Sequence, residues 1–220
     1  MAESKKKLLI LVVAYNSEKF IKNVLSRIDE NLAKKYDVEI LINDDSSTDG
    51  TLRATKEYIN FSTNKNFKYK ILSNPENQGY GGNQKIGYEY AIKNNFDFVA
   101  LLRGDGQYAP EYLQTLIDPL NSDNIDAVFG SRMMTKGGAL KGGMPLYKFV
   151  GNKILTFFQN SMFSTNFTEF HSGYRIYRVS SLKKVPFELN AKNYSFDNEI
   201  IVQFLIAKLT IKELPIPTYY

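Results

Sequence analysis

Residues 8–14 read LLILVVA, a continuous apolar run near the start of the chain. Runs of this kind, rich in branched side chains, are typical of β-strands that are covered on both faces. Lys5–Lys7 precede the run, as in a secretory signal peptide, but Tyr15–Glu18 stand where a cleavage site of small residues would lie. The run therefore predicts a buried first strand, and a signal peptide is the weaker alternative.

Strands and helices are expected to alternate from this first strand to about residue 130. Further strands are predicted at Val38–Ile42, Phe67–Leu72, Phe96–Leu102 and Ala127–Gly130. Helices are predicted between them, from Ser17 to Ile28, from Thr48 or Asp49 to Ile59, from Gly82 to Lys93 and from Pro110 to Leu120. Such alternation indicates right-handed βαβ units, hence an α/β protein with a mostly parallel central sheet flanked by helices.

The remainder of the chain is less regular. Lys136–Gly143 is rich in Gly and Lys and is predicted to be mobile. Helices are expected at Tyr147–Phe163 and Phe196–Ala207, and strands at Gly173–Tyr177 and Thr210–Ile216. We find no internal repeat and no low-complexity linker, so residues 1–220 are expected to form a single domain.

The composition excludes several classes of protein and of site. With 220 residues, 43% hydrophobic and 23% charged, the chain is an ordinary globular sequence. The absence of Cys excludes disulfides, thiolate metal sites and a Cys nucleophile, and a single His171 excludes sites that need several imidazoles. The net charge of +5 suits an anionic partner such as a nucleotide, a lipid phosphate, a membrane surface or a nucleic acid.

Polar residues cluster directly after three of the predicted strands. The clusters are Ala14–Asn16, Asn43–Asp45 and Arg103–Gln107. In open α/β sheets, ligands bind beyond the carboxyl ends of the strands, so these clusters are expected to converge on one site. Their carboxylates could accept hydrogen bonds from a base or ribose, or could bind a divalent cation beside a pyrophosphate. The alternative is that each Asp only caps a helix or forms a turn.

Other phosphate-binding signals are weaker. The backbone N–H groups of Gly79–Gly82, ahead of a helix, could face an anion. No glycine-rich loop ends in Gly-Lys-Ser/Thr, which argues against a P-loop nucleotidase. The glycines at 79–82 do not follow the first strand, so the dinucleotide-binding fingerprint is also missing.

Several motifs together resemble one enzyme family. They are DDSSTDGT (44–51), NPENQGYGGNQKIG (74–87), RGDGQYAPE (103–111), FGSR (129–132) and EFHSGYRIY (169–177). In this order they resemble the family 2 inverting glycosyltransferases, which have the GT-A fold. GGMPLYKFVGNKILT (142–156) and SFDNEI (195–200) are similar to the branch that transfers sugars to dolichyl or polyprenyl phosphate.

The resemblance implies a role for particular residues. The donor nucleotide sugar, linked to UDP or GDP, would be bound by Ala14, Tyr15, Asn16, Glu18, Asp44, Asp45, Gly79, Arg103 and Arg132. Catalytic roles would fall to Asp105, Glu169 and Arg175, and Mg²⁺ or Mn²⁺ would be bound by Asp105 with Gln107. Residues 1–131 would form the nucleotide-sugar-binding half, and residues 132–220 the acceptor-binding half.

One residue departs from the family pattern. Arg103 stands where the first acidic residue of the Asp-x-Asp metal motif would be, so a positive charge replaces a negative one. The metal could be bound by Asp105, Gln107 and phosphate oxygens, which would weaken but not abolish metal dependence. Alternatively, Arg103 could replace part of the metal's electrostatic role, or the domain could bind a nucleotide sugar without turning it over.

The resemblance implies a single displacement with inversion at the anomeric carbon. Charge develops on the departing diphosphate, where the metal, Arg132 and Arg175 would stabilise it. A hydroxyl acceptor would need a general base, for which Glu169 is the candidate. A lipid phosphate is already ionised and needs none.

The acceptor and the location follow from weaker signals. Lys136, Lys141, Lys148 and Lys153 alternate with large apolar residues and could meet an anionic membrane surface, or form an ordinary solvated loop and amphipathic helix. We expect a polyprenyl phosphate acceptor and a cytoplasmic location at the membrane surface, with no nucleic-acid partner. A saccharide acceptor and a non-catalytic nucleotide-sugar-binding module are the alternatives, and the oligomeric state is left open.

Overall fold

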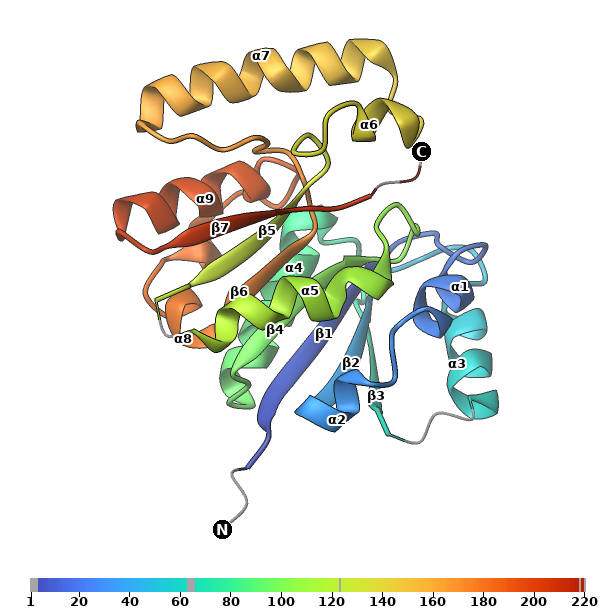
Figure 1. The fold of residues 1–220 in the computed structure, drawn as a ribbon. Helices are drawn as coiled ribbons and strands as arrows, with labels where there is room; N and C mark the ends of the chain where they lie inside the picture. Colours follow the sequence, from blue (N-terminus) through green and yellow to red (C-terminus); the bar gives the residue numbers. More distant parts are fainter. Residues whose placement is uncertain (1–3, 63–65, 123, 218, 220) are drawn as a thin grey trace.

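The fold is built on a seven-stranded sheet. A computed structural model describes residues 4–62, 66–122, 124–217 and 219. Its strands lie in the order β3-β2-β1-β4-β6-β5-β7 (Figure 1). They are β1 (Lys6–Ala14), β2 (Tyr36–Asp44), β3 (Lys68–Ser73), β4 (Phe98–Arg103), β5 (Ala127–Ser131), β6 (Arg175–Arg178) and β7 (Ile211–Pro215).

Strand β1 lies between β2 and β4 and is parallel to both. Ala14 pairs with Asp44 and Val13 pairs with Arg103, so the carboxyl ends of these strands meet at one edge of the sheet. The pairs β2–β3 and β5–β7 are also parallel, whereas β6 runs antiparallel to β4 and β5. The prediction of an α/β fold with a mostly parallel sheet is confirmed.

Helices cover both faces of this sheet (Figure 1). Leu8, Ile10 and Val12 of β1 pack in a core with one layer of helices, and Leu9 and Leu11 pack in a second core with the other. The first layer comprises α1 (Ile21–Ser26), α2 (Leu32–Lys35), α3 (Thr51–Phe61) and α5 (Leu113–Ile117). The second comprises α4 (Gly79–Lys93), α8 (Val179–Leu182) and α9 (Phe196–Ile206).

Helix α7 (Leu146–Phe163) lies outside these two layers, beyond β7 and α9 (Figure 1). Only Asn152 and Thr156 of its 18 residues are buried. The preceding segment, predicted to be mobile, contains the short helix α6 (Gly138–Lys141), whose Ala139 is buried. Helix α7 is therefore joined to the domain mainly by polar side chains, with Phe163 packed against Phe170 at its end, and most of its large apolar side chains are exposed.

The structure differs from the sequence prediction in its short elements. Helices α2 and α8 were not predicted. The helix expected from Pro110 to Leu120 is divided into the 3-10 turns Pro110–Tyr112 and Asp118–Asn121 with α5 between them. Pro119 explains the second break, because proline cannot donate the hydrogen bond that would continue an α-helix. Helix α1 begins at Ile21, later than predicted.

Gly81 allows the start of α4 to pack against the loop before α9. A Cβ atom on Gly81 would lie 2.5 Å from the carbonyl oxygen of Ala191 and 2.7 Å from Cβ of Phe196. We expect Gly81→Ala to lower the free energy of unfolding by about 1–3 kcal/mol, as overpacking does. Urea denaturation checks this.

Gly151→Ala in α7 is the matched control, because a Cβ atom there would meet nothing within 4 Å. Ala is favoured over Gly in a helix interior by about 1 kcal/mol, so this variant should be as stable as the natural protein or slightly more so. If both substitutions changed stability by the same amount, the close approach at Gly81 would carry no energetic weight.

Candidate functional site

A hollow of about 340 Å³ opens at the carboxyl ends of β1 and β4; we call it the first hollow. It is lined by Val13, Ala14, Tyr15, Ser17, Asp45, Asn77, Gly79, Tyr80, Asn83, Arg103, Gly104, Asp105, Asn193 and Tyr194. The three polar clusters that follow β1, β2 and β4 all contribute. The predicted convergence of these strand ends is confirmed.

A second hollow, of about 620 Å³, adjoins the first and shares Arg103, Asp105 and Tyr194 with it. It continues past Gln107 and Tyr108 to Arg132, Lys148 and His171. A smaller space of about 290 Å³ begins at these last three residues and extends to Asn152 and Leu155 of α7. The hollows therefore form a continuous path from the sheet edge to α7.

Arg103 and Asp105 form an ion pair where the two hollows meet. A guanidinium nitrogen of Arg103 lies 2.6 Å from Oδ2 of Asp105, and the backbone N–H of Gln107 donates to Oδ1 at 3.1 Å. The guanidinium also lies 5.5 Å from the centre of the Tyr80 ring. Although burial opposes the charge of Arg103, the carboxylate of Asp105 holds its pKa above the ordinary value.

Asp45 is the second carboxylate of the first hollow. Its Oδ1 accepts hydrogen bonds from the side chain of Asn74 and the backbone N–H of Gln78, both at 2.8 Å. These bonds connect the end of β2 to the start of α4. Asp45 therefore faces the hollow with an orientation fixed by two donors.

Three predicted donor-binding residues do not line either hollow. Asn16 accepts from the backbone N–H of Thr48 at 2.9 Å. Glu18 accepts from the N–H of Gly50 and from Arg53, and buried Asp44 accepts from the N–H of Ser47. These side chains join the loops that follow β1 and β2. Their geometry fits a role in shaping the site rather than direct contact with a ligand there.

The expectation that the N–H groups of residues 79–82 face an anion is wrong for three of these groups. The N–H of Gly79 donates to the side chain of Asn77 at 2.9 Å. Those of Gly81 and Gly82 donate to the carbonyl oxygen of Lys192 at 2.7 and 3.2 Å. The loop before α9 therefore occupies the start of α4. Gly79, with φ of 77°, still lines the first hollow.

Arg132 and Glu169 form a buried ion pair beneath the second hollow. Glu169 accepts from Nε of Arg132 at 2.9 Å, from another guanidinium nitrogen and from the backbone N–H of Arg132 at 2.8 Å. Its Oε1 also accepts from the side chain of Asn152 at 2.7 Å. Glu169 thus orients Arg132, which lines the second hollow, and connects it to α7.

The general-base role expected of Glu169 does not fit this geometry. Its side chain is 0% exposed and lines none of the three hollows described above. A base must come within hydrogen-bond reach of the proton that it removes. Buried among the donors of Arg132 and Asn152, Glu169 is instead a positioning residue.

Arg175 is also placed differently from expectation. It is 0% exposed, and its guanidinium donates to the carbonyl oxygens of Ser172, Phe170 and Asp197. The carboxylate of Asp197 lies 3.8 Å away. The predicted contact with an anionic acceptor or diphosphate is not made from this position. A buried guanidinium needs several acceptors, and here the backbone supplies them.

The sequence model of glycosyl transferase family 2 matches residues 9–186 of the chain. The chain belongs to this family. The UDP-N-acetylglucosamine–dolichyl-phosphate N-acetylglucosaminyltransferase of Methanococcus voltae is 33% identical over 97% of this chain and 86% of that protein. The polyprenol monophosphomannose synthase of Mycolicibacterium smegmatis is 22% identical over 94% of this chain and 76% of that protein.

The fold comparison agrees with the family. Glucosyl-3-phosphoglycerate synthase from Mycobacterium tuberculosis, solved with Mn²⁺, UDP and phosphoglyceric acid, superposes with a TM-score of 0.69. The match covers 96% of this chain and 68% of the other, at 16% identity. The fold of this glycosyltransferase is therefore GT-A, as the sequence predicted.

Several residues of the glycosyltransferase site were not predicted from the sequence. Tyr194 stacks on Tyr80 with ring centres 4.8 Å apart and lines both hollows. Asn77, Asn83 and Asn193 also line the first hollow. The signal for Tyr194 in the sequence is that it directly precedes the SFDNEI motif at 195–200.

His171 lines the second hollow. Burial lowers the pKa of its imidazole below the ordinary value. Its Nε2 is buried without a hydrogen-bond partner within the described part of the chain. Burial therefore disfavours the charged form of the imidazole, and Nε2 is available for a hydrogen bond with a ligand.

The residues expected to bind a metal are partly suited to it. Asp105 supplies a carboxylate where the hollows meet, and Gln107 lines the second hollow. Mg²⁺ commonly uses one or two protein carboxylates together with substrate phosphates and water. Among the residues that the structure describes, no three His, Cys, Asp or Glu side chains form a metal-binding group. The donor set fits an ion whose remaining ligands come from phosphate and water.

The buried ion pair of Glu169 should contribute far more to stability than an exposed one. We expect Glu169→Gln to lower the free energy of unfolding by about 3–5 kcal/mol, because it leaves the buried charge of Arg132 without its counter-ion. Glu18→Gln is the matched control, since Glu18 likewise binds an arginine and a backbone N–H but is 39% exposed. It should cost less than about 1 kcal/mol.

Urea denaturation of both variants measures the difference. If both variants lost a similar amount of unfolding free energy, the buried contacts that Glu169 makes with Arg132 would be no stronger than the exposed ones of Glu18. That result would contradict the positioning role given to Glu169.

Proposed function

We propose that this glycosyltransferase transfers a sugar from a UDP- or GDP-linked donor to a polyprenyl phosphate, by a single displacement that inverts the anomeric carbon. The observation that supports it most is the continuous path from the carboxyl ends of β1 and β4 to α7, which carries cationic side chains along its length. The related dolichyl- and polyprenyl-phosphate enzymes support the same acceptor class.

The first hollow suits the nucleotide of the donor. Its aromatic side chains Tyr15 and Tyr194 offer surfaces for a base, and Asp45 offers acceptors for base or ribose donors. Apart from Asn193 and Tyr194, its lining comes from residues 13–105. This supports the division into a nucleotide-sugar-binding half at 1–131 and an acceptor-binding half at 132–220, with a loop of the second half covering the nucleotide.

The diphosphate would lie where the two hollows meet. Arg103 and Arg132 face this region and would stabilise the charge that develops as the nucleoside diphosphate departs. A divalent ion bound by Asp105 and Gln107 would supply further positive charge beside the leaving phosphate. The Mn²⁺ and UDP of the M. tuberculosis enzyme support such use of metal.

The chemistry of the second hollow favours an anionic acceptor. Asp105 is the only carboxylate among its described lining residues, and it is paired with Arg103. Arg132, Lys148 and His171 lie along the same hollow and suit a phosphate. A phosphate monoester is already ionised near neutral pH and attacks without a general base. A saccharide hydroxyl would need a general base, for which Asp105, already paired with Arg103, and His171 are the candidates in this hollow.

Labelled sugar transfer tests this function. The protein is incubated with UDP-N-acetylglucosamine, UDP-glucose or GDP-mannose, each labelled in the sugar, with and without a polyprenyl phosphate. We expect one donor to give a product that extracts into organic solvent, together with an equal amount of released nucleoside diphosphate. Omitting the polyprenyl phosphate should abolish both.

Two other outcomes support the alternative functions. Label that enters a water-soluble saccharide instead would indicate a saccharide acceptor. Donor binding without nucleoside diphosphate release, with every acceptor supplied, would indicate a non-catalytic nucleotide-sugar-binding module. Either result contradicts the proposed acceptor.

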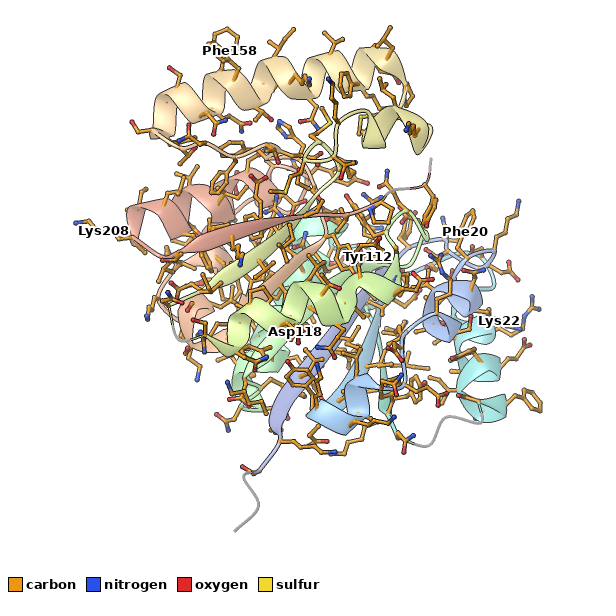
Figure 2. The ribbon with its side chains drawn as sticks, viewed as in Figure 1. Phe20, Lys22, Tyr112, Asp118, Phe158 and Lys208 are labelled. Carbon is orange, nitrogen blue, oxygen red and sulfur yellow. The ribbon has the colours of Figure 1, made fainter. Side chains whose placement is uncertain are left out.

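Helix α7 suits contact with a membrane surface, where a polyprenyl phosphate resides. Its large apolar side chains are exposed: Leu146, Tyr147, Val150, Ile154, Leu155, Phe157, Phe158 and Met162 are each between 45% and 74% accessible. Phe158 points away from the rest of the domain (Figure 2). Lys148 and Lys153 lie on the same helix and suit anionic headgroups.

No helix within the described ranges is long and apolar enough to cross a membrane. Contact through α7 would place its exposed apolar side chains at the level of the headgroups. A cytoplasmic location at the membrane surface stays a prediction.

Vesicle flotation tests this contact. We expect the protein to float with vesicles that contain anionic phospholipid, and Phe157→Ser combined with Phe158→Ser to weaken partitioning at least about tenfold, because each buried Phe contributes on the order of 2 kcal/mol. Phe61→Ser, at an 84% exposed phenylalanine of α3, is the matched control and should leave partitioning unchanged. Equal partitioning of all three proteins would contradict the role of α7.

A further inference from the structure

Arg103 is a cation held at the place where the donor diphosphate is proposed to lie. It ends β4 and lines the first hollow, the second hollow and a third space next to Ser195 and Asp197. Its side chain is 26% exposed. The backbone of Arg103 is fixed at the end of the sheet, and its side chain remains accessible to solvent and so to a ligand.

Two contacts fix the guanidinium while leaving donors for a ligand. Asp105 accepts from one nitrogen at 2.6 Å, and the Tyr80 ring lies 5.5 Å from the guanidinium carbon. A guanidinium has five N–H donors in a planar fork that matches phosphate oxygens. The hydrogen bonds that it makes within the described part of the chain engage one of them. The remaining donors can bind an anion without breaking the ion pair.

The net charge of Arg103 and Asp105 differs from that of the two carboxylates in an Asp-x-Asp metal motif. Two carboxylates would repel a diphosphate unless a divalent cation lay between them. Arg103 and Asp105 together carry no net charge, and both side chains line the two hollows, so the guanidinium is within reach of an anion bound there. The same pairing occupies an oxygen of Asp105 that a metal ion would otherwise use.

We propose that Arg103 is a built-in cation for the donor diphosphate, so that this chain binds a nucleoside diphosphate without a divalent metal ion. This inference rests on the proposed function, because it concerns the same donor. The inference concerns binding of the nucleotide alone. A bound metal could still contribute to the departure of the leaving phosphate. The competing interpretation is that Arg103 only fastens the loop that follows β4.

Calorimetric titration of UDP and GDP separates these interpretations. For the natural protein we expect one of the two nucleotides to bind in EDTA with a dissociation constant within about threefold of that in Mn²⁺, a difference below about 1 kcal/mol. Arg103→Gln should weaken binding in EDTA at least about tenfold, the scale of a hydrogen bond to a charged group.

Arg103→Asp should reverse the metal dependence. It replaces the cation by a second carboxylate beside Asp105, so the variant should bind Mn²⁺ more tightly in the absence of nucleotide, as measured by electron paramagnetic resonance. Its nucleotide binding should be lost in EDTA and recovered in Mn²⁺, and that recovery also demonstrates that the variant is folded. Arg53→Gln, at an exposed arginine paired with Glu18, is the matched control and should behave like the natural protein.

The outcomes that overturn the inference are distinct from those that overturn the function. If the natural protein binds a nucleotide only in Mn²⁺, or if Arg103→Gln binds normally in EDTA, Arg103 is not the resident cation and the proposed function is unaffected. If the natural protein binds neither UDP nor GDP under either condition, the proposed function itself fails.

Discussion

The parallel pairing of β1 with β2 and β4 is the constraint on which the site depends. Because β1 is covered on both faces, its continuous apolar run keeps it in the interior between the two neighbours, in parallel register with both. That register brings Ala14, Asp44 and Arg103 to the same edge. A shift by one residue would exchange the two faces of β1, and the clusters beyond the strand ends would no longer surround one hollow.

Buried charges connect this edge to the more distant parts of the molecule. The buried carboxylate of Glu169 needs hydrogen-bond donors, and it obtains them from Arg132 and from Asn152 of α7. A polar side of α7 therefore turns inward and most of its large apolar side chains are exposed, which is the reverse of an ordinary surface helix. The contacts that orient Arg132 thus also leave the large apolar side chains of α7 exposed at the end of the path farthest from the sheet edge.

The ion pair of Arg103 and Asp105 sets the electrostatics of the site at the end of β4. The backbone of β4 pairs with β1 up to Arg103 in the parallel register that positions a ligand site. The charge at the end of β4, however, depends on whether its last residue carries a carboxylate or, like Arg103, a guanidinium. A guanidinium attracts phosphate and occupies the neighbouring carboxylate, so metal and arginine compete for the same partners.

The alternation of strands and helices, the family, and the convergence of residues near 14, 45 and 105 can all be predicted from the sequence, because apolar periodicity and local motifs depend on neighbours along the chain. Which polar residues face the hollows depends on the tertiary structure. Arg175 and Glu169 stand in family motifs but are buried by segments distant in the sequence, whereas Tyr194 reaches the site from the loop before α9. Burial and hydrogen-bond partners arise from contacts between such segments, which residue type and spacing do not specify.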